Sequence, residues 1–537
     1  MRSILLPLVF FSLALSDVTY GQSAKSPIPE IQWQKCLGGS SADYGFDIIQ
    51  TSDGGYAICG FVTSTDSDVV GHHGGGEDAW VAKLDASGNL QWAKCYGGSG
   101  PEEANSIAQT KDGGYILAVR TESNDSQVSG YHGIGDAWIV KLDDTGAIQR
   151  DSCYGGLNYD DPCSIIATSD GSYLFAGYTQ SDTPPDLNEH HGEGDDAWVI
   201  KINTSGFTPG FERWFGGTKQ DQANSVIQTT DGGYIFTGFT HSSDDDVVGY
   251  KGGTSADVWV VKLTPTGYIE WQKCLGGTAD EWANSIIQTS DGGYAIAGIT
   301  YSTDGDVTGN HGGGDEWVAK LSRTGDLEWQ KCLGGSGKDL AWSIVQTPDG
   351  GYAVGGYTGS SDGDVSGSHG GQDVWLVELD GQGNLQWQKC MGGSAFDQAL
   401  AMILTKDGGF ALTGNTSSTD GDVHGIKGHT NAWVVKLSPV ADIFPTPIAS
   451  SNGLSLVALP NSNGTSVAIS YNLSRLSDAT LHVANITGLE IEEMHLGVNA
   501  SGHHDVLLDC SRYVAGTYFV TLQASGNTCT VAVEIGR

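Results

Sequence analysis

Short apolar runs alternate with turn residues along most of the chain, and the alternation recurs as a unit. In one copy the runs cover residues 283–289, 294–300, 316–322 and 327–334, separated by Asp-Gly-Gly, a long Asp/Gly loop and a turn at Gly325. Short β-type runs bounded by Gly and Asp are typical of antiparallel strands. The Asp-Gly-Gly step supplies the positive φ angles that a tight hairpin needs. Each copy therefore predicts one four-stranded sheet.

The unit occurs seven times. Its Gly-Gly pair starts at Gly38, Gly97, Gly155, Gly216, Gly276, Gly334 and Gly392, in steps of 59, 58, 61, 60, 58 and 58 residues. Repeats of this length are typical of solenoids and propellers. An extra fourth-strand pattern occurs at 31–36, before the first complete unit, and the last unit lacks a fourth strand after 433–437. If the N-terminal strand completes the last unit, both open edges disappear. We therefore predict an all-β fold, a seven-bladed β-propeller over 31–437 that the N-terminal strand closes.

Tryptophan recurs at two positions of the repeat. The third strands carry Trp80, Trp138, Trp198, Trp259, Trp317, Trp375 and Trp433, and the fourth strands carry Trp33, Trp92, Trp271, Trp329 and Trp387. A sugar-stacking surface is the alternative, but repetition in nearly every copy favours packing between blades.

The two ends of the chain follow other patterns. Met1-Arg2 precedes an apolar run over 4–15 and then small and polar residues, which is the pattern of a secretory signal peptide. We assign 1–21 to this peptide and 22–30 to a linker. A Pro/Ser/Ala linker covers 438–453. Over 454–537, five alternating runs at 467–473, 480–486, 504–508, 517–523 and 528–535 predict a small β-sandwich. No later segment approaches the roughly 20 apolar residues of a transmembrane helix.

Composition narrows the functional classes. The chain has 537 residues, with 26 Lys and Arg against 64 Asp and Glu, for a net charge of −38. Such a chain would repel a phosphate backbone, so nucleic-acid binding is excluded. With 39% hydrophobic residues and 15 tryptophans it has ample material for a core.

Three columns of chemically biased residues fall on the loop-rich face predicted to carry ligands. The first is a carboxylate four residues after each Gly-Gly pair: Asp43, Glu102, Asp160, Asp221, Glu281, Asp339 and Asp397. A ring of seven acids would suit a cation or ligand. The alternative is that each acid accepts hydrogen bonds from its own turn.

The second column is a D-x-D pair in the long loop: Asp66 and Asp68, Asp244 and Asp246, Asp304 and Asp306, Asp362 and Asp364, and Asp420 and Asp422. Spaced carboxylates among flexible glycines are candidate Ca²⁺ ligands. Asx turns produce the same pattern, so both interpretations stay open.

The third column is His73, His132, His191, Lys251, His311, His369 and Lys427. Histidines beside acids suggest a transition metal. Lysine donates hydrogen bonds and does not ligate, so we favour a loop contact with the Asp two residues before the third-strand Trp.

Cysteine usage gives few disulfide candidates. Six of the ten cysteines occupy one column of the repeat, where equivalent positions lie too far apart to bridge. Only Cys153–Cys163 and Cys510–Cys529 are proposed as pairs.

No set of catalytic residues stands out, and no nucleophile elbow, H-E-x-x-H motif or phosphate-binding loop is present. The second and third copies depart most from the repeat, with Arg120, Glu122, Arg150 and an altered segment at 159–162. An enzyme site would break the symmetry in this way, as would neutral drift.

The tail carries a resemblance to a known family. Its segments FPTP, SYNLS, VANITG, GHHDVLLDCSRYVAGTYFVTL and VAVEIGR resemble the C-terminal sorting domain of the bacterial type IX secretion system. The resemblance implies export by the secretion machinery and release or surface attachment. The residues that carry it include Pro445, Pro447, Gly502, His504, Gly516 and Tyr518. The preceding repeats are similar to the Gly-rich propeller repeats of secreted Bacteroidota proteins.

The leading hypothesis is a secreted or surface-attached binding and adhesion module, not an enzyme, whose loop face contacts glycans or proteins with help from calcium. The alternatives are a secreted polysaccharide hydrolase or lyase, which needs a carboxylate pair in a cleft over the second and third blades, and a structural surface-layer protein.

Overall fold

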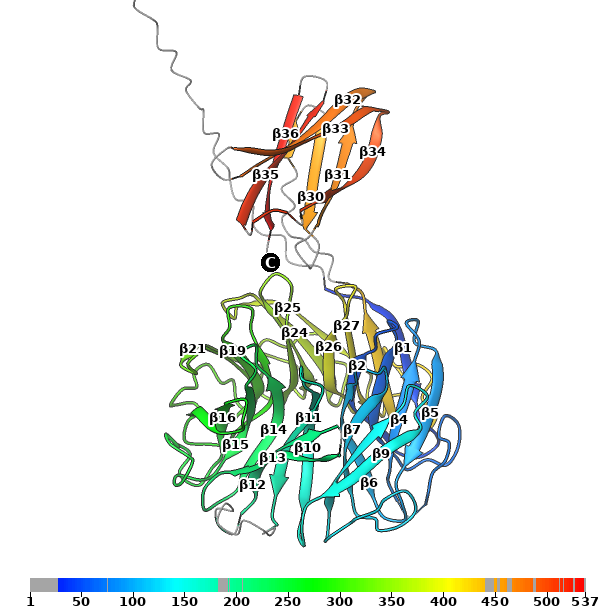
Figure 1. Cartoon of the computed structure of the whole chain (residues 1–537), viewed down its shortest axis with the longest axis vertical. Coiled ribbons are helices and arrows are strands. Elements are labelled where there is room, and N and C mark those ends of the chain that lie inside the picture. The colour runs from blue at the N-terminus through cyan, green and yellow to red at the C-terminus, as the bar shows by residue number, and fades with distance from the viewer. Residues whose placement is uncertain are drawn as a thin grey trace, which may run out of the picture. The chain divides into compact units, whose positions relative to one another are not determined.

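The structure of the chain is a computed structural model. It describes residues 28–535 except 75, 182–191, 193, 205, 440–448, 452–453, 461–465, 486–488, 511, 515 and 525–526. The predicted signal peptide, most of the 22–30 linker, His191, Pro445 and Pro447 lie outside the described residues. The chain divides into two compact units, Pro27–Ala441 and a second that contains Asp442–Arg537. Both consist of strands (Figure 1), and the described residues include no helix of the length and apolarity that crossing a membrane requires.

The unit Pro27–Ala441 contains seven four-stranded antiparallel sheets. The first sheet has β2 (Asp43–Gln50), β3 (Tyr56–Val62), β4 (Asp78–Leu84) and β5 (Leu90–Tyr96), and the second has β6 (Glu102–Gln109), β7 (Tyr115–Thr121), β8 (Asp136–Leu142) and β9 (Ile148–Tyr154). The third has β10 (Asp160–Ala167), β11 (Tyr173–Thr179), β12 (Asp196–Asn203) and β13 (Thr208–Phe215), and the fourth has β14 (Asp221–Gln228), β15 (Tyr234–Thr240), β16 (Asp257–Leu263) and β17 (Ile269–Leu275). The fifth has β18 (Glu281–Gln288), β19 (Tyr294–Thr300), β20 (Asp315–Leu321) and β21 (Leu327–Leu333), and the sixth has β22 (Asp339–Gln346), β23 (Tyr352–Thr358), β24 (Asp373–Leu379) and β25 (Leu385–Met391). The seventh combines β26 (Asp397–Leu404), β27 (Phe410–Thr416) and β28 (Asn431–Leu437) with β1 (Ile31–Leu37), the spare N-terminal strand, which pairs with β28.

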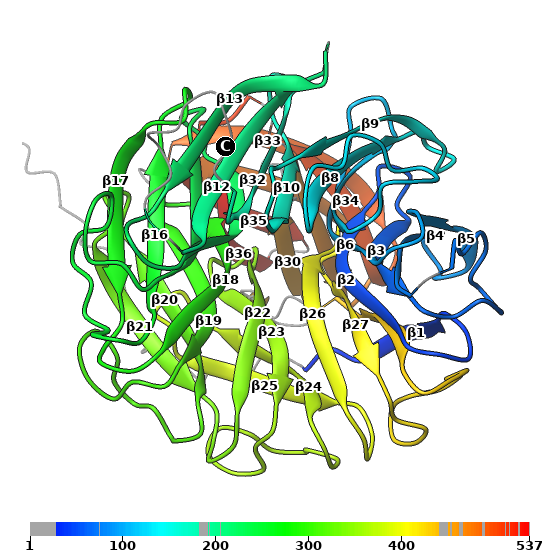
Figure 2. The same cartoon turned by 90° about the horizontal axis from the view of Figure 1, so that it is seen from below.

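The sheets lie around a common centre, with the first strand of each sheet innermost (Figure 2). These innermost strands contact one another in the order β2, β6, β10, β14, β18, β22 and β26, and β26 also contacts β2. Fourth-strand tryptophans join neighbouring sheets on the outside. The turn glycine of the next sheet packs on four of these rings, as Gly88 does on Trp33 and Gly325 on Trp271.

The third-strand tryptophans are core residues, as predicted, each at most 1% exposed. In six sheets the indole N–H donates to a side chain on the fourth strand, for example from Trp317 Nε1 to Gln330 Oε1 at 2.9 Å. The exception is Trp80, whose Nε1 has no partner among the described residues because Ala93 replaces the acceptor. Burial of the indole rings and hydrogen bonding of their N–H groups together stabilise tryptophan at this core position of the third strand.

The two proposed disulfides are wrong, because all ten cysteines are free thiols. Cys153 ends β9, the outermost strand of the second sheet, whereas Cys163 lies on β10, the innermost strand of the third. Cys510 and Cys529 are buried in the second unit, where their thiols donate to the carbonyls of Leu508 and Leu454.

The second unit is a pair of four-stranded sheets around one core. One sheet has the order β29 (Ala449–Ser451), β30 (Leu454–Pro460), β31 (Ser466–Leu473) and β34 (Gly502–Asp509); the other has β33 (Glu490–Asn499), β32 (Ser477–Asn485), β35 (Gly516–Ala524) and β36 (Asn527–Ile535). The sequence predicted five of these strands and missed β29, β30 and β33.

Candidate functional site

The carboxylate column of the loop face is buried, so it forms no exposed ring of acids. All seven side chains of this column are at most 1% exposed. Asp339 is typical: its Oδ2 accepts from the Gly335 amide at 2.8 Å and from the Ser360 hydroxyl at 2.8 Å, and Thr358 Oγ1 donates to Oδ1. Equivalent bonds are made by Asp43, Glu102, Asp160, Asp221, Glu281 and Asp397.

These acids therefore fasten the Gly-Gly turn to the end of the second strand. Burial raises the pKa of Asp160 and of Asp221 to about 6, although the hydroxyl and amide donors oppose the shift. The hydroxyl donors belong to a Thr-x-Ser segment at the end of most second strands, such as Thr358 and Ser360. This segment was the signal in the sequence that would have identified the acids as turn anchors.

The D-x-D carboxylates bind the same turn from its other side. Asp304 Oδ1 accepts from the Thr278 amide at 2.8 Å, and Asp306 Oδ2 accepts from the Gly276 amide at 3.2 Å. The first acids of the other pairs, Asp66, Asp244, Asp362 and Asp420, and the second acids Asp68, Asp364 and Asp422 make the matching bonds. Within the described residues, no group of three ligand side chains lies within 4.8 Å at these loops. Calcium binding there stays a prediction.

The His/Lys column divides by residue type. His73, His132 and His311 place Nδ1 2.7–2.8 Å from an oxygen of the Asp before the third-strand Trp, as predicted. Lys251 and Lys427 reach instead to the next sheet, where their ammonium groups donate to Asp306 and Asp68. In the described loops, the column therefore holds the loop to its own sheet, and its two lysines tie two pairs of neighbouring sheets together.

The four described residues of the predicted sorting signal make packing contacts and hydrogen bonds within the second unit or begin its strands. His504 stacks on Tyr471 with ring centroids 5.2 Å apart, and the Tyr518 hydroxyl donates to the Val514 carbonyl at 2.8 Å. Gly502 and Gly516 begin β34 and β35.

The innermost strands instead enclose the cavity that best fits a ligand site. It has a volume of about 840 Å³, and residues of all seven sheets line it. Ligand sites typically span about 300–1,000 Å³ and combine apolar walls with a few polar groups. Loop columns repeat in every sheet, but the cavity walls differ from sheet to sheet.

One arc of the cavity wall is aromatic. Trp282 lies edge-on to Phe239 at 6.4 Å and to Tyr301 at 6.1 Å between ring centroids, and Trp342 and Tyr357 continue the arc. On the first sheet, a second group follows, in which Tyr44 stacks on Phe61 at 4.8 Å and Phe46 adjoins both rings.

The opposite, charged arc carries Glu103 from the second sheet and Asp161 from the third, and Arg120, Glu122 and Tyr178 lie beside it without lining the cavity. Arg120 donates from Nη1 to Glu103 Oε1 at 3.0 Å and from Nη2 to Glu122. Asp161 accepts from Asn105 Nδ2 at 2.9 Å and from the Tyr178 hydroxyl at 3.1 Å. Burial raises the pKa of Asp161, and it raises the pKa of Glu103 to about 7 against the opposing charge of Arg120.

Two buried polar atoms of the cavity lining have no hydrogen-bond partner in the described part of the chain. They are Nε1 of Trp342, a donor, and Oδ1 of Asn415, an acceptor on a side chain that is 6% exposed. A buried polar group without a partner costs about 1–3 kcal/mol. Both atoms are shielded from solvent, so a ligand in the cavity would reach them after a movement of the Trp342 or Asn415 side chain.

Sequence reasoning found part of this site. It singled out Arg120, Glu122 and the 159–162 segment as departures from the repeat, and these adjoin the charged arc. It missed the aromatic arc, because Trp282 and Trp342 lie outside the two tryptophan columns and the innermost strand was not examined for its inward side chains.

No family model matches the chain. Regulatory protein FlaEY of Caulobacter vibrioides is 24% identical to it over 403 residues, which are 66% of this chain and 41% of that protein. The chain thus spans less than half the length of this relative.

Solved structures with similar folds include the Pan2 WD40 domain of Neurospora crassa, with 12% identity, 75% of this chain and 95% of that chain covered, and a TM-score of 0.41. Another is PorZ, a surface component of the type-IX secretion system of Porphyromonas gingivalis, with 9% identity and a TM-score of 0.30. The match covers 90% of this chain and 69% of PorZ. With TM-scores below 0.5, these likenesses carry no argument about function.

Proposed function

We propose that this chain is a secreted carbohydrate-binding protein whose seven sheets are the blades of a closed β-propeller and whose central cavity holds the sugar. Pairing of β1 with β28 and the unbroken series of contacts between innermost strands support closure. The observation that carries the function is the pairing of an aromatic arc with a charged arc around unpartnered polar atoms. Sugar rings offer apolar C–H faces to aromatic rings and hydroxyls that both donate and accept.

This proposal moves the contact surface from the loop columns to the cavity. The loop acids are committed to their own turns. In the cavity, Asp161, Glu103 and Asn415 offer acceptors to hydroxyls, and Trp342 Nε1 offers a donor.

A glycan array probed with the labelled full chain, followed by calorimetry with the best glycan, tests the function. We expect Trp342→Ala and Asn415→Ala each to weaken binding about tenfold, which is 1.4 kcal/mol. Asn415→Ala should not lower stability, because Oδ1 makes no hydrogen bond within the described residues that the substitution would remove. The control is Tyr268→Ala, which removes an aromatic ring that is 60% exposed and not part of the cavity lining. Unchanged binding by both cavity variants would overturn the proposal.

A hydrolase is the second candidate, because Glu103 and Asp161 line the cavity from neighbouring sheets and the pKa of Glu103 is raised to about 7. A carboxyl that stays protonated near neutral pH suits a general acid, and a glycosidase needs a second carboxylate nearby. Release of reducing sugar from bound glycans, abolished by Glu103→Gln with binding retained, would establish this activity. No release by the wild-type chain would exclude it for those glycans.

Export through the type IX system remains part of the proposal, on the strength of the signal-peptide pattern and the tail motifs. In the native host, a chain that ends after residue 437 should stay in the periplasm while the full chain reaches the surface or medium. Equal export of both would remove the tail from the account.

A further inference from the structure

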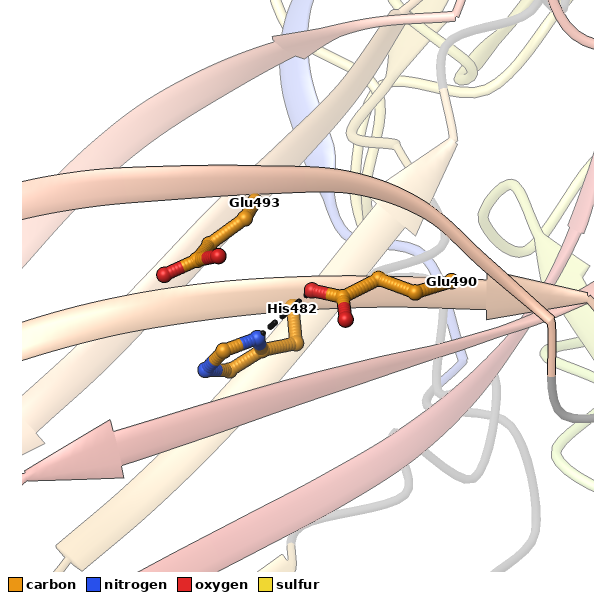
Figure 3. A group of neighbouring side chains, drawn as sticks. All are labelled: His482, Glu490 and Glu493. Carbon is orange, nitrogen blue, oxygen red and sulfur yellow. Dashed lines mark hydrogen bonds and ion pairs between the residues drawn. The ribbon is translucent and has the colours of Figure 1, made fainter.

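A cluster of ligand side chains lies on the outer face of the sheet β33-β32-β35-β36, in the C-terminal unit (Figure 3). His482 on β32 points toward Glu490 on β33, with Nδ1 2.9 Å from Oε1, and Glu493 of β33 faces the same space. One ligand atom from each residue lies within 4.8 Å of the others. Among the described residues, this is the one group of three or more His, Cys, Asp or Glu that meets this distance.

A β-bulge brings the two glutamates to one face. Glu490 and Glu493 are three residues apart, so a regular strand would point them to opposite faces. The register shifts between Val483, which pairs with Glu492, and Ala484, which pairs with Glu490, so Ile491 is left without a partner. The exposure of both Glu490 and Ile491 agrees with this shift. Bulges re-aim side chains in this way and occur often beside functional sites.

A second histidine extends the cluster along the same face. His482 pairs with Glu493, and two residues away Thr480 pairs with His495. His495 Nε2 lies 3.3 Å from an oxygen of Glu493. The face therefore offers two imidazoles and two carboxylates on adjacent strands.

We propose that His482, Glu490 and Glu493 form a site for a first-row transition ion of the zinc type, and that His495, which contacts Glu493 but lies outside the 4.8 Å group, joins them by rotation of its exposed side chain. Zinc binds imidazole nitrogen and carboxylate oxygen at about 2.0–2.2 Å, which sets tetrahedral ligands about 3.4 Å apart. The observed separations of 2.9 Å and 3.3 Å are close to that value. Calcium, which takes six to eight oxygen ligands, does not suit a site with two nitrogens.

A bound ion would tie the edge strand β33 to β32. The site is independent of the central cavity, because all four ligands belong to the C-terminal unit. Either proposal can therefore fail without the other.

The test is a zinc titration by calorimetry of the untagged full chain after chelator treatment. We expect His482→Ala to bind one zinc fewer than the wild type, or to bind it at least tenfold more weakly, and Glu490→Gln to weaken it as well. Asp478→Asn is the matched control, because it removes an exposed carboxylate of the same strand that is not part of the cluster.

Cobalt provides a second readout that does not depend on heats. Co²⁺ held by nitrogen and oxygen ligands of this site should give a visible absorption band that His482→Ala removes and Asp478→Asn keeps. Equal zinc stoichiometry and affinity in the wild type and His482→Ala, or an unchanged cobalt band, would overturn the proposal.

Discussion

Replacing Glu316 with valine should stabilise the repeat unit, and by an amount that grows with pH. Glu316 lies on β20 directly before Trp317, is 0% exposed, and neither carboxyl oxygen has a hydrogen-bond partner in the described residues. The equivalent residue in the other six sheets is alanine or valine. Valine at 316 therefore matches the packing that the repeat already uses.

The free energy that Glu316→Val should gain has two parts. A neutral buried carboxyl without a partner costs about 1–3 kcal/mol, and this part does not depend on pH. Burial, reinforced by Asp339 and Asp315, raises the pKa of Glu316 well above its usual range. Because the folded pKa is the higher one, the destabilisation contributed by Glu316 is smallest below its unfolded pKa of about 4.3 and grows as the pH rises toward the folded pKa. The slope is about 1.4 kcal/mol per pH unit between the two pKa values.

Urea unfolding of the full chain at pH 5, 6 and 7, followed by tryptophan fluorescence, measures this difference, because all 15 tryptophans lie between residues 33 and 433. The difference between Glu316→Val and the wild type should grow as the pH rises, by at most about 1.4 kcal/mol per pH unit. Glu316→Gln, which cannot ionise but keeps the polar group, should lose the pH dependence and remain less stable than Glu316→Val. A pH-independent difference, or a variant less stable than the wild type, would refute the reasoning.

Two other substitutions probe departures from the repeat, and a pair of glycine substitutions probes one of its repeated turns. Ala93→Gln should supply the acceptor that Trp80 Nε1 lacks and raise stability by about 1 kcal/mol in the same urea assay; a lower midpoint would contradict it. Glu378→Lys should raise the melting temperature, because the six other sheets place a lysine at this position. That lysine pairs with the Asp of the Asp-Gly turn, as Lys320 does with Asp291 at 3.0 Å, and the new lysine would pair with Asp349 in the same way. An unchanged melting temperature would refute this pairing. Gly363→Ala should destabilise more than Gly367→Ala: both have positive φ, at 67° and 80°, but a Cβ at Gly363 would lie 2.3 Å from the Gly334 carbonyl oxygen, while none meets Gly367. Equal losses would show that this close approach has no effect.

Local periodicity predicted most strands because each run is apolar and bounded by Gly or Asp. The strand β19 was predicted with its observed bounds, Tyr294–Thr300. The innermost strand β18 begins two residues earlier than predicted, at Glu281, because the anchoring carboxylate is itself part of the strand. In the tail, β33 was missed because the bulge at Ile491 breaks its alternation and its outer face is polar.

The site was harder to predict for a different reason. Columns of repeated residues draw attention in a sequence, but repetition here marks the acids that hold each turn together, such as Asp339. The cavity depends on positions where the seven copies differ, such as Trp342 and Asn415, and on which side of the innermost strand each residue faces. That information comes from the arrangement of the sheets around the centre.

A crystal structure of the full chain with the glycan that binds best would test the central claim most directly. The account predicts a sugar in the central cavity, with a ring against Trp282 or Trp342 and hydroxyls bonded to Asn415 and to Asp161 or Glu103. A sugar bound at the Asp-rich loops with the cavity empty would contradict it.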